Sequence, residues 1–189
     1  MPDKASRLLL DHLDLLLDLD PSLPVLDLAC GTGRNGLLLA QHGIDVVFAD
    51  KSDTALNIVK NQIQGRTLPG RCWQVDLELP ETNPFSGQTF SGILGFRYLH
   101  RPLFPALKNA LIGGGLIVYE TFTVENRRFG RPSNPDFLLN HGELKMIVHD
   151  WQRIHYFEGL RPNPDRAMAQ IIARKPVRPC HNSAAPHVL

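Results

Sequence analysis

The feature that most constrains the fold is a short apolar segment that runs into a glycine-bearing turn at residues 25–35, with the sequence VLDLACGTGRN. Its first five residues are apolar apart from Asp27, and they predict a buried strand. Gly31 and Gly33 follow, and a leucine-rich helical pattern begins directly after them. Glycines let the main chain bend and approach a ligand where a Cβ atom would obstruct it. Because such a strand–turn–helix unit brings backbone N–H groups and a helix N-terminus to a ligand, the segment predicts a ligand-binding α/β domain.

Apolar strand patterns alternate with helical patterns through most of the chain. Strands are expected at 25–29, 44–49, 71–75, 90–96 and 116–119, and helices over 36–41, 55–63 and 102–111, the last ended by the glycines at 113–115. Two further strands, 151–157 and 168–173, are joined by a proline-rich turn and predict an antiparallel pair. The predicted fold is therefore α/β and doubly wound (Rossmann-like), a mostly parallel seven-stranded sheet with a C-terminal antiparallel strand pair.

The remaining segments suggest one domain with two distinct ends. Residues 4–19 have the spacing of an amphipathic helix, which either packs against the sheet or covers a bound cofactor. Residues 121–139 are expected to form a long ordered loop, and 143–149 a short helix. We expect residues 1–174 to form a single domain, and residues 175–189, rich in Pro, Ser, Ala and His, to be a disordered tail.

Net charge and cysteine content limit the classes of partner and the cellular compartment that fit this chain. A formal net charge of +1 argues against a general nucleic-acid binder. Cys30, Cys72 and Cys180 are odd in number and far apart, which predicts reduced thiols rather than a disulfide framework or a metal site. No apolar run approaches the roughly 18 residues of a membrane span. We expect a cytoplasmic protein, a monomer or homodimer, with no membrane partner.

Two ligand classes fit the glycine turn. Gly31-x-Gly33-x-x-Gly36, with Asp50 near the end of the next strand, matches the dinucleotide fingerprint and leaves a nicotinamide-dependent oxidoreductase open. Asp27 lies inside the first strand, however, where a dinucleotide has no use for a carboxylate. S-adenosylmethionine (SAM) carries an ammonium group and a sulfonium, which favour an anionic neighbour. The antiparallel end of the predicted sheet also favours SAM.

The sequence at 27–35, DLACGTGRN, resembles the first motif of the class I SAM-dependent methyltransferases. Within that class, Gly33-Arg34-Asn35 resembles the small bacterial enzymes related to tellurite-resistance methyltransferases, and the segments 97–102 and 131–139 resemble their uncharacterised relatives. The resemblance covers roughly residues 20–174. Two positions depart from the pattern: Ala29 replaces the usual first glycine, and Ser91-Gly92 replaces an acid early in the fourth strand. We expect both changes to be tolerated.

The resemblance implies a set of cofactor-binding residues. Asp27 would orient the methionine ammonium, Asp50 would accept hydrogen bonds from the ribose hydroxyls, and Asp76 would meet the adenine amine. The backbone from Cys30 to Gly33 would pass along the methionine and ribose. The full expected set is Asp27, Ala29, Cys30, Gly31, Gly33, Asn35, Asp50, Lys51, Asp76, Leu77 and Phe96.

The methyl acceptor is expected beyond the fourth and fifth strands, where open sheets place their ligands. Tyr98 and His100 are the candidates for a general base. The residues expected to bind the acceptor are Arg97, Arg101, Glu120, Arg131 and Asn134. Arg127 and Arg128 extend an arginine cluster that indicates either a solvated loop or a site for a small anion.

The sequence therefore predicts an enzyme that moves a methyl group from SAM to a small, anionic molecule by in-line displacement and releases S-adenosylhomocysteine. A nucleic-acid acceptor is disfavoured because the chain has no appended RNA-binding domain. Two alternatives remain open: an NAD-dependent oxidoreductase, and a SAM-binding sensor or scaffold without turnover.

Overall fold

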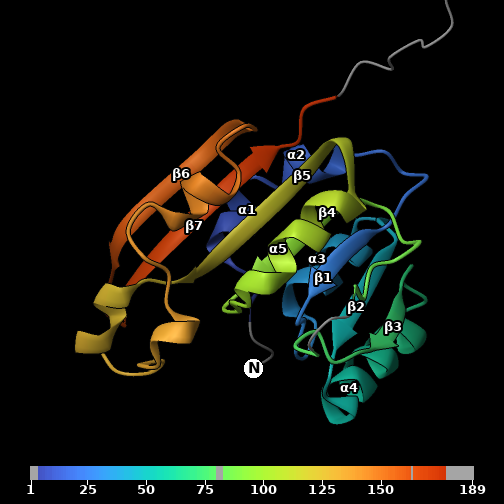
Figure 1. Cartoon of the computed structure of the whole chain (residues 1–189). Helices are drawn as coiled ribbons and strands as arrows, with labels where there is room; N and C mark the ends of the chain where they lie inside the picture. Colours follow the sequence, from blue (N-terminus) through green and yellow to red (C-terminus); the bar gives the residue numbers. More distant parts are fainter. Residues whose placement is uncertain (1–3, 80–82, 163, 178–189) are drawn as a thin grey trace, which may run out of the picture.

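The computed structural model describes residues 4–79, 83–162 and 164–177. Its strands form one seven-stranded sheet in the order β3-β2-β1-β4-β5-β7-β6 (Figure 1). The strands are β1 (Val25–Leu28), β2 (Val46–Asp50), β3 (Arg71–Gln74), β4 (Phe90–Phe96), β5 (Leu111–Phe122), β6 (Gln152–Arg161) and β7 (Arg166–Arg174). The helices are α1 (Arg7–Asp11), α2 (Leu13–Leu17), α3 (Arg34–Gln41), α4 (Asp53–Gly65), α5 (Phe104–Ala110) and α6 (Glu143–Ile147), with 3-10 turns η1 (Arg101–Leu103), η2 (Val124–Arg128) and η3 (Pro135–Phe137).

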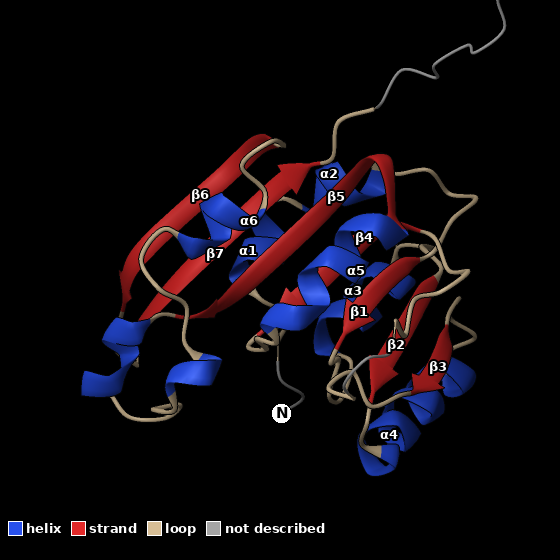
Figure 2. Cartoon of the chain, viewed as in Figure 1, coloured by secondary structure: helices blue, strands red, loops and turns tan. Residues whose placement is uncertain are grey.

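β1 lies inside the parallel part of the sheet, between β2 and β4. Asp27 stands opposite Phe48 on one neighbour and Leu94 on the other. At the far end of the sheet, β7 runs antiparallel to both β5 and β6 (Figure 2). The predicted doubly wound fold and its antiparallel end are confirmed. Because parallel strands all end at the same edge, the carboxyl ends of β1 to β5 form one rim, which we call the carboxyl rim.

Side chains alternate between the two faces of β1, and a different group of helices buries each face. Leu26 and Leu28 belong to the core that packs against α5 and α6. Val25 belongs to the core that α1 to α4 cover. Asp27 shares the face of Val25, so its carboxylate is directed to α3.

Three local expectations are corrected by the structure. The single helix expected over 4–19 is two short helices, because the backbone at His12 leaves the helical range at φ −131°. The glycines at 113–115 lie inside β5 instead of ending α5: Gly114 N donates to the carbonyl of Lys175, and Lys175 N donates to that of Gly115. The loop expected at 121–139 contains the end of β5 and the turns η2 and η3.

A disordered tail was expected at residues 175–189. Residues 178–189 of it, Cys180 among them, lie outside the described residues. Within the described part of the chain, no helix is both long enough and apolar enough to cross a membrane.

Candidate functional site

The turn between β1 and α3 holds a left-handed backbone at three residues. The φ angle is +49° at Ala29, +55° at Gly31 and +76° at Gly33. Glycine adopts this conformation without strain, whereas alanine does so at a cost of roughly 1–2 kcal/mol. Ala29 therefore keeps the left-handed turn at the expense of backbone strain.

Asp27 is a buried acid beside this turn. The residue is 2% exposed, and its Oδ2 accepts a hydrogen bond from the backbone N of Gly36 at 2.9 Å. Burial raises the pKa of Asp27 to about 7, and the Gly36 hydrogen bond and the charge of Arg34 offset only part of that effect. A Cβ on Gly36 would lie 2.5 Å from Phe48 Cε1 and 2.7 Å from Oδ2, so a larger residue would displace the Phe48 ring, the carboxylate or both. Asp27 lines a cavity of about 180 Å³, the turn cavity, together with residues 28–32, 34 and 35 and with Phe96 and Arg97.

Asp50 and Asp76 lie farther along the carboxyl rim. Asp50 Oδ2 accepts from the N of Gly31 at 2.8 Å, and its Oδ1 accepts from the N of Ser52 at 2.9 Å. Asp76 follows β3 and is exposed, and its Oδ1 accepts from the N of Glu78 at 3.0 Å. Both acids line a second cavity of about 180 Å³, the rim cavity. Its walls are Ala29, Asp50, Lys51, Val75, Asp76, Leu77, Glu78 and Tyr98.

A third cavity, of about 330 Å³, lies beyond the end of β4. We call it the aromatic cavity. Its walls are Glu78, Arg97, Tyr98, Leu99, Phe122, Pro132 and Phe137. Arg97 also lines the turn cavity, and Tyr98 and Glu78 also line the rim cavity, so the three cavities adjoin one another. Glu78, Phe122, Pro132 and Phe137 were not among the residues expected at the site, although Pro132 and Phe137 lie in the segment 131–139 that the sequence had singled out.

Arg97 and Tyr98 form the turn that leaves β4. Arg97 has a left-handed φ of +58°, and its N donates to the carbonyl of Glu120 at 2.7 Å. The Tyr119 hydroxyl donates to the carbonyl of Tyr98 at 2.8 Å and fixes this turn to β5. Burial, followed by the nearby charges of Glu78 and other acids, raises the pKa of Tyr98 well above its usual range. At neutral pH Tyr98 is therefore a protonated hydrogen-bond donor and a poor general base.

A buried polar network ties the N-terminal segment to the carboxyl rim. Ser6 N donates to Asn35 Oδ1 at 2.8 Å, and Ser6 Oγ donates to Glu120 Oε1 at 3.3 Å. The other carboxylate oxygen of Glu120 accepts from Gln170 Nε2. Asn35 and Glu120 thus have protein partners, and α1 is anchored next to the turn. No sequence pattern marks Ser6 or Gln170 for this role.

The expected acceptor-binding residues do not all gather at the aromatic cavity. Arg101 forms a two-pronged ion pair with Glu143, at 2.6 Å and 2.9 Å, and joins α6 to the chain before α5. Asn134 Oδ1 accepts a backbone N–H inside η3 at 3.1 Å. His100 is half-buried before η1 and outside the three cavities, and Arg131 is exposed.

Cys30 and Lys51, two other residues expected to bind the cofactor, each line one of these cavities. Cys30 lines the turn cavity, and burial together with the charge of Asp27 raises the pKa of its thiol, so the group is not a thiolate nucleophile. Lys51 is exposed at the rim cavity, with Nζ 3.9 Å from a carboxylate oxygen of Glu78.

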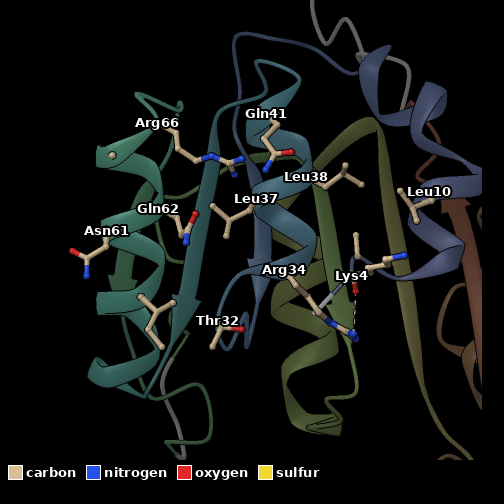
Figure 3. Close-up of a pocket in the computed structure, with 13 residues that line it drawn as sticks. Lys4, Leu10, Thr32, Arg34, Leu37, Leu38, Gln41, Asn61, Gln62 and Arg66 are labelled. Atoms are coloured by element: carbon tan, nitrogen blue, oxygen red, sulfur yellow. Dashed lines mark hydrogen bonds between the residues drawn. The ribbon is translucent and has the colours of Figure 1, made fainter. Parts of the chain in front are cut away.

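A larger cavity, of about 990 Å³, lies outside the sheet between α1, α3 and α4 (Figure 3). Arg34 borders it and donates to the carbonyl of Lys4 at 3.4 Å. Its walls contain no carboxylate. Thr32 and Arg34 of the glycine turn border both this cavity and the turn cavity. Because the larger cavity offers no anionic partner, the three cavities along the carboxyl rim are the candidate ligand site.

A family model described as a methyltransferase domain matches residues 25–112. A search of curated proteins finds no match. Among solved structures, TehB from Haemophilus influenzae is 23% identical with a TM-score of 0.71, over 87% of this chain and 61% of that one. A SAM-dependent methyltransferase from Methanosarcina mazei is 13% identical with a TM-score of 0.65, over 93% of this chain and 100% of that one.

A third similar structure is the geranyl diphosphate C-methyltransferase from Streptomyces coelicolor A3(2), in complex with Mg²⁺, geranyl diphosphate and S-adenosylhomocysteine. It is 16% identical with a TM-score of 0.65, over 86% of this chain and 77% of that one. The chain spans less than two thirds of TehB. At these identities the structural likeness establishes the fold alone.

Proposed function

We propose that this chain moves a methyl group from SAM to a small molecule. The match to a methyltransferase domain and the fold shared with SAM-dependent methyltransferases support the proposal. One observation carries the proposal: three carboxylates lie at or near the carboxyl ends of β1, β2 and β3, beside a glycine turn. Asp27 lies at the turn cavity, and Asp50 and Asp76 lie at the rim cavity. A ligand with an ammonium group, ribose hydroxyls and an adenine amine would present a donor to each acid in turn.

The surroundings of each acid fit this ligand. Asp27 is the partner for the ammonium group, because a cation nearby would lower the pKa that burial has raised and would make the carboxylate form favourable. Each oxygen of Asp50 already accepts one backbone N–H, which leaves further lone pairs for ribose hydroxyls. Leu77 and Phe96 supply apolar walls.

SAM supplies a methyl group on a sulfonium, and its transfer is an in-line displacement. The protein then contributes mainly positioning and the exclusion of water. The N-terminal segment is fastened through Ser6 to Asn35, a wall residue of the turn cavity, and to Glu120 on β5. Because Tyr98 stays protonated, it would orient the acceptor as a donor. We infer that the acceptor is a nucleophile that needs no strong base from the protein.

The dinucleotide alternative retains one supporting feature, the spacing of Gly31, Gly33 and Gly36 before Asp50. A buried carboxylate at Asp27 argues against it, since a pyrophosphate at the start of α3 would lie close to that acid. Titration calorimetry with S-adenosylhomocysteine and with NAD⁺ separates the two ligands. We expect the first to bind and the second not to, and binding of NAD⁺ alone would refute the proposal.

The same assay tests the carboxylates. Asp50→Ala should weaken S-adenosylhomocysteine binding at least tenfold, because each hydrogen bond to a charged group contributes roughly 1.5–3 kcal/mol. The matched control is Asp18→Ala, an exposed acid outside the three cavities, and it should bind normally. Methyl transfer is then followed with labelled SAM on a broad small-molecule panel. Tight cofactor binding without transfer to any compound would favour the sensor or scaffold alternative.

A further inference from the structure

We propose that the aromatic cavity binds the methyl acceptor, and that this acceptor is a flat, apolar ring compound carrying one anionic group. The inference rests on the proposed function and deepens it by naming the class of acceptor. It narrows the sequence-based expectation of a small anionic acceptor, because an apolar wall would serve no purpose for an inorganic oxyanion.

The position of the cavity makes it the acceptor site. It shares Arg97 with the turn cavity and Tyr98 with the rim cavity, so it adjoins both ends of the proposed cofactor site. A molecule in it would face the middle of a bound cofactor, where the sulfonium would lie. Its volume of about 330 Å³ is near the lower end of the roughly 300–1,000 Å³ found for small-molecule pockets. A one- or two-ring compound fits this size better than a polymer segment does.

The walls of the cavity are mainly apolar and aromatic. Leu99 is buried in its wall, Phe122 lies at the end of β5, and Phe137 comes from η3. Phe137 is 48% exposed, although the two residues that follow it are fully buried. A ring stacked against these side chains would cover apolar surface that otherwise faces water. A hydrated inorganic oxyanion would gain nothing from them.

Charge at the cavity calls for one anionic group on the ring. Arg97 is exposed, and no acidic partner contacts its guanidinium among the described residues. Glu78, the acid in the wall, lies 3.9 Å from Lys51 Nζ, which offsets part of its charge. Arg101 is paired with Glu143 and does not line the cavity, so Arg97 supplies the guanidinium in its wall. Guanidinium groups bind carboxylates through paired hydrogen bonds, so the anion has a defined place.

The backbone supports a role for this side chain. Arg97 adopts φ +58°, a conformation that glycine would adopt without strain. Strain of this kind clusters at functional sites, where the surrounding structure holds it in place. Beside it, the Tyr98 hydroxyl is buried without a hydrogen-bond partner among the described residues. A bound polar group or a water would satisfy it, which is the usual reason for such an orphaned donor.

The test measures binding to protein saturated with S-adenosylhomocysteine, by titration calorimetry. The probes are 4-hydroxybenzoate, 4-hydroxyphenylacetate and indole-3-acetate, each beside its neutral amide, with tellurite as the inorganic oxyanion. We expect at least one acid to bind about tenfold more tightly than its amide, and tellurite to bind more weakly. Arg97→Gln should abolish the preference for the acid, and Phe137→Ala should weaken acid and amide alike. Arg127→Gln is the matched control, because Arg127 is exposed and lies outside the cavity.

Several results would overturn this inference while leaving the proposed function intact. Equal binding of every acid and its amide is one, and tighter binding of tellurite than of any ring compound is another. Arg97→Gln could also weaken S-adenosylhomocysteine and leave the acid preference unchanged, which would assign Arg97 to the cofactor instead. Failure of the wild-type protein to bind S-adenosylhomocysteine at all would instead refute the proposed function.

Discussion

Replacing Asp27 with asparagine should make the ligand-free protein more stable above neutral pH. Burial raises the pKa of Asp27 from 3.8 to about 7, so between these values the folded protein holds a proton that the unfolded chain has released. The free energy of unfolding therefore falls as the pH rises through this window. The shift spans about three pH units, and at roughly 1.4 kcal/mol per unit the loss approaches 4 kcal/mol by pH 8.

Asparagine removes this loss and keeps the local geometry. Its side-chain oxygen can accept the hydrogen bond from Gly36 N that Oδ2 accepts now. Urea denaturation followed by circular dichroism, at intervals from pH 5 to pH 8.5, measures the effect. The wild-type protein should lose stability across the range, and Asp27→Asn should lose about 2–4 kcal/mol less. Asp18→Asn, at an exposed position, should follow the wild type.

Proton release on ligand binding is a second test of the protonation state of Asp27. An ammonium group beside Asp27 favours its charged form, so binding of S-adenosylhomocysteine at pH 7 should release about half a proton. Calorimetry in buffers of different ionisation enthalpy measures that number. Asp27→Asn should release none and should bind more weakly. Equal pH dependence of the two proteins would refute the burial argument, and unchanged affinity would remove Asp27 from the cofactor site.

Three further substitutions test the geometry of the site. Ala29→Gly should raise stability by about 0.5–1 kcal/mol in urea, because relief of the left-handed strain exceeds the added chain entropy; a loss would show that the turn is not strained. Gly36→Ala should cost about 1–3 kcal/mol and also weaken S-adenosylhomocysteine, since its Cβ displaces the carboxylate of Asp27; normal affinity would contradict this. Tyr119→Phe should cost about 1 kcal/mol by removing the donor to the Tyr98 carbonyl, and an unchanged urea midpoint would speak against that hydrogen bond.

The sequence predicted the parts of the fold and site that depend on local pattern. The alternation of strands and helices was sufficient to predict a mostly parallel sheet, because short connections and right-handed crossovers allow few arrangements of the strands. It also located three acids next to strand ends. Parallel pairing then brings those ends to one rim, so Asp27, Asp50 and Asp76 border adjoining cavities although they are far apart in the chain.

Contacts between distant segments could not be predicted in this way. Arg101 looked like a free guanidinium, but its partner Glu143 lies 42 residues further along the chain. Ser6 reaches Glu120 across 114 residues, and a serine in an N-terminal segment has no pattern that would indicate this. The glycines at 113–115 were expected to end a helix because local rules cannot show that Lys175 pairs with them.

Several unfavourable features of the described residues lie at the proposed ligand site, although Thr67 also has a left-handed backbone and Arg161 Nε is also buried without a partner. Asp27 is an acid in an apolar setting, and Ala29 and Arg97 hold left-handed backbones. The Tyr98 hydroxyl lacks a partner within the described residues. Natural proteins retain such features where function requires them, since each one lowers stability. A cationic ligand would reduce the cost of the buried charge of Asp27, and a polar group on the acceptor would pair the Tyr98 hydroxyl. Cofactor and acceptor should therefore each stabilise the folded protein when they bind.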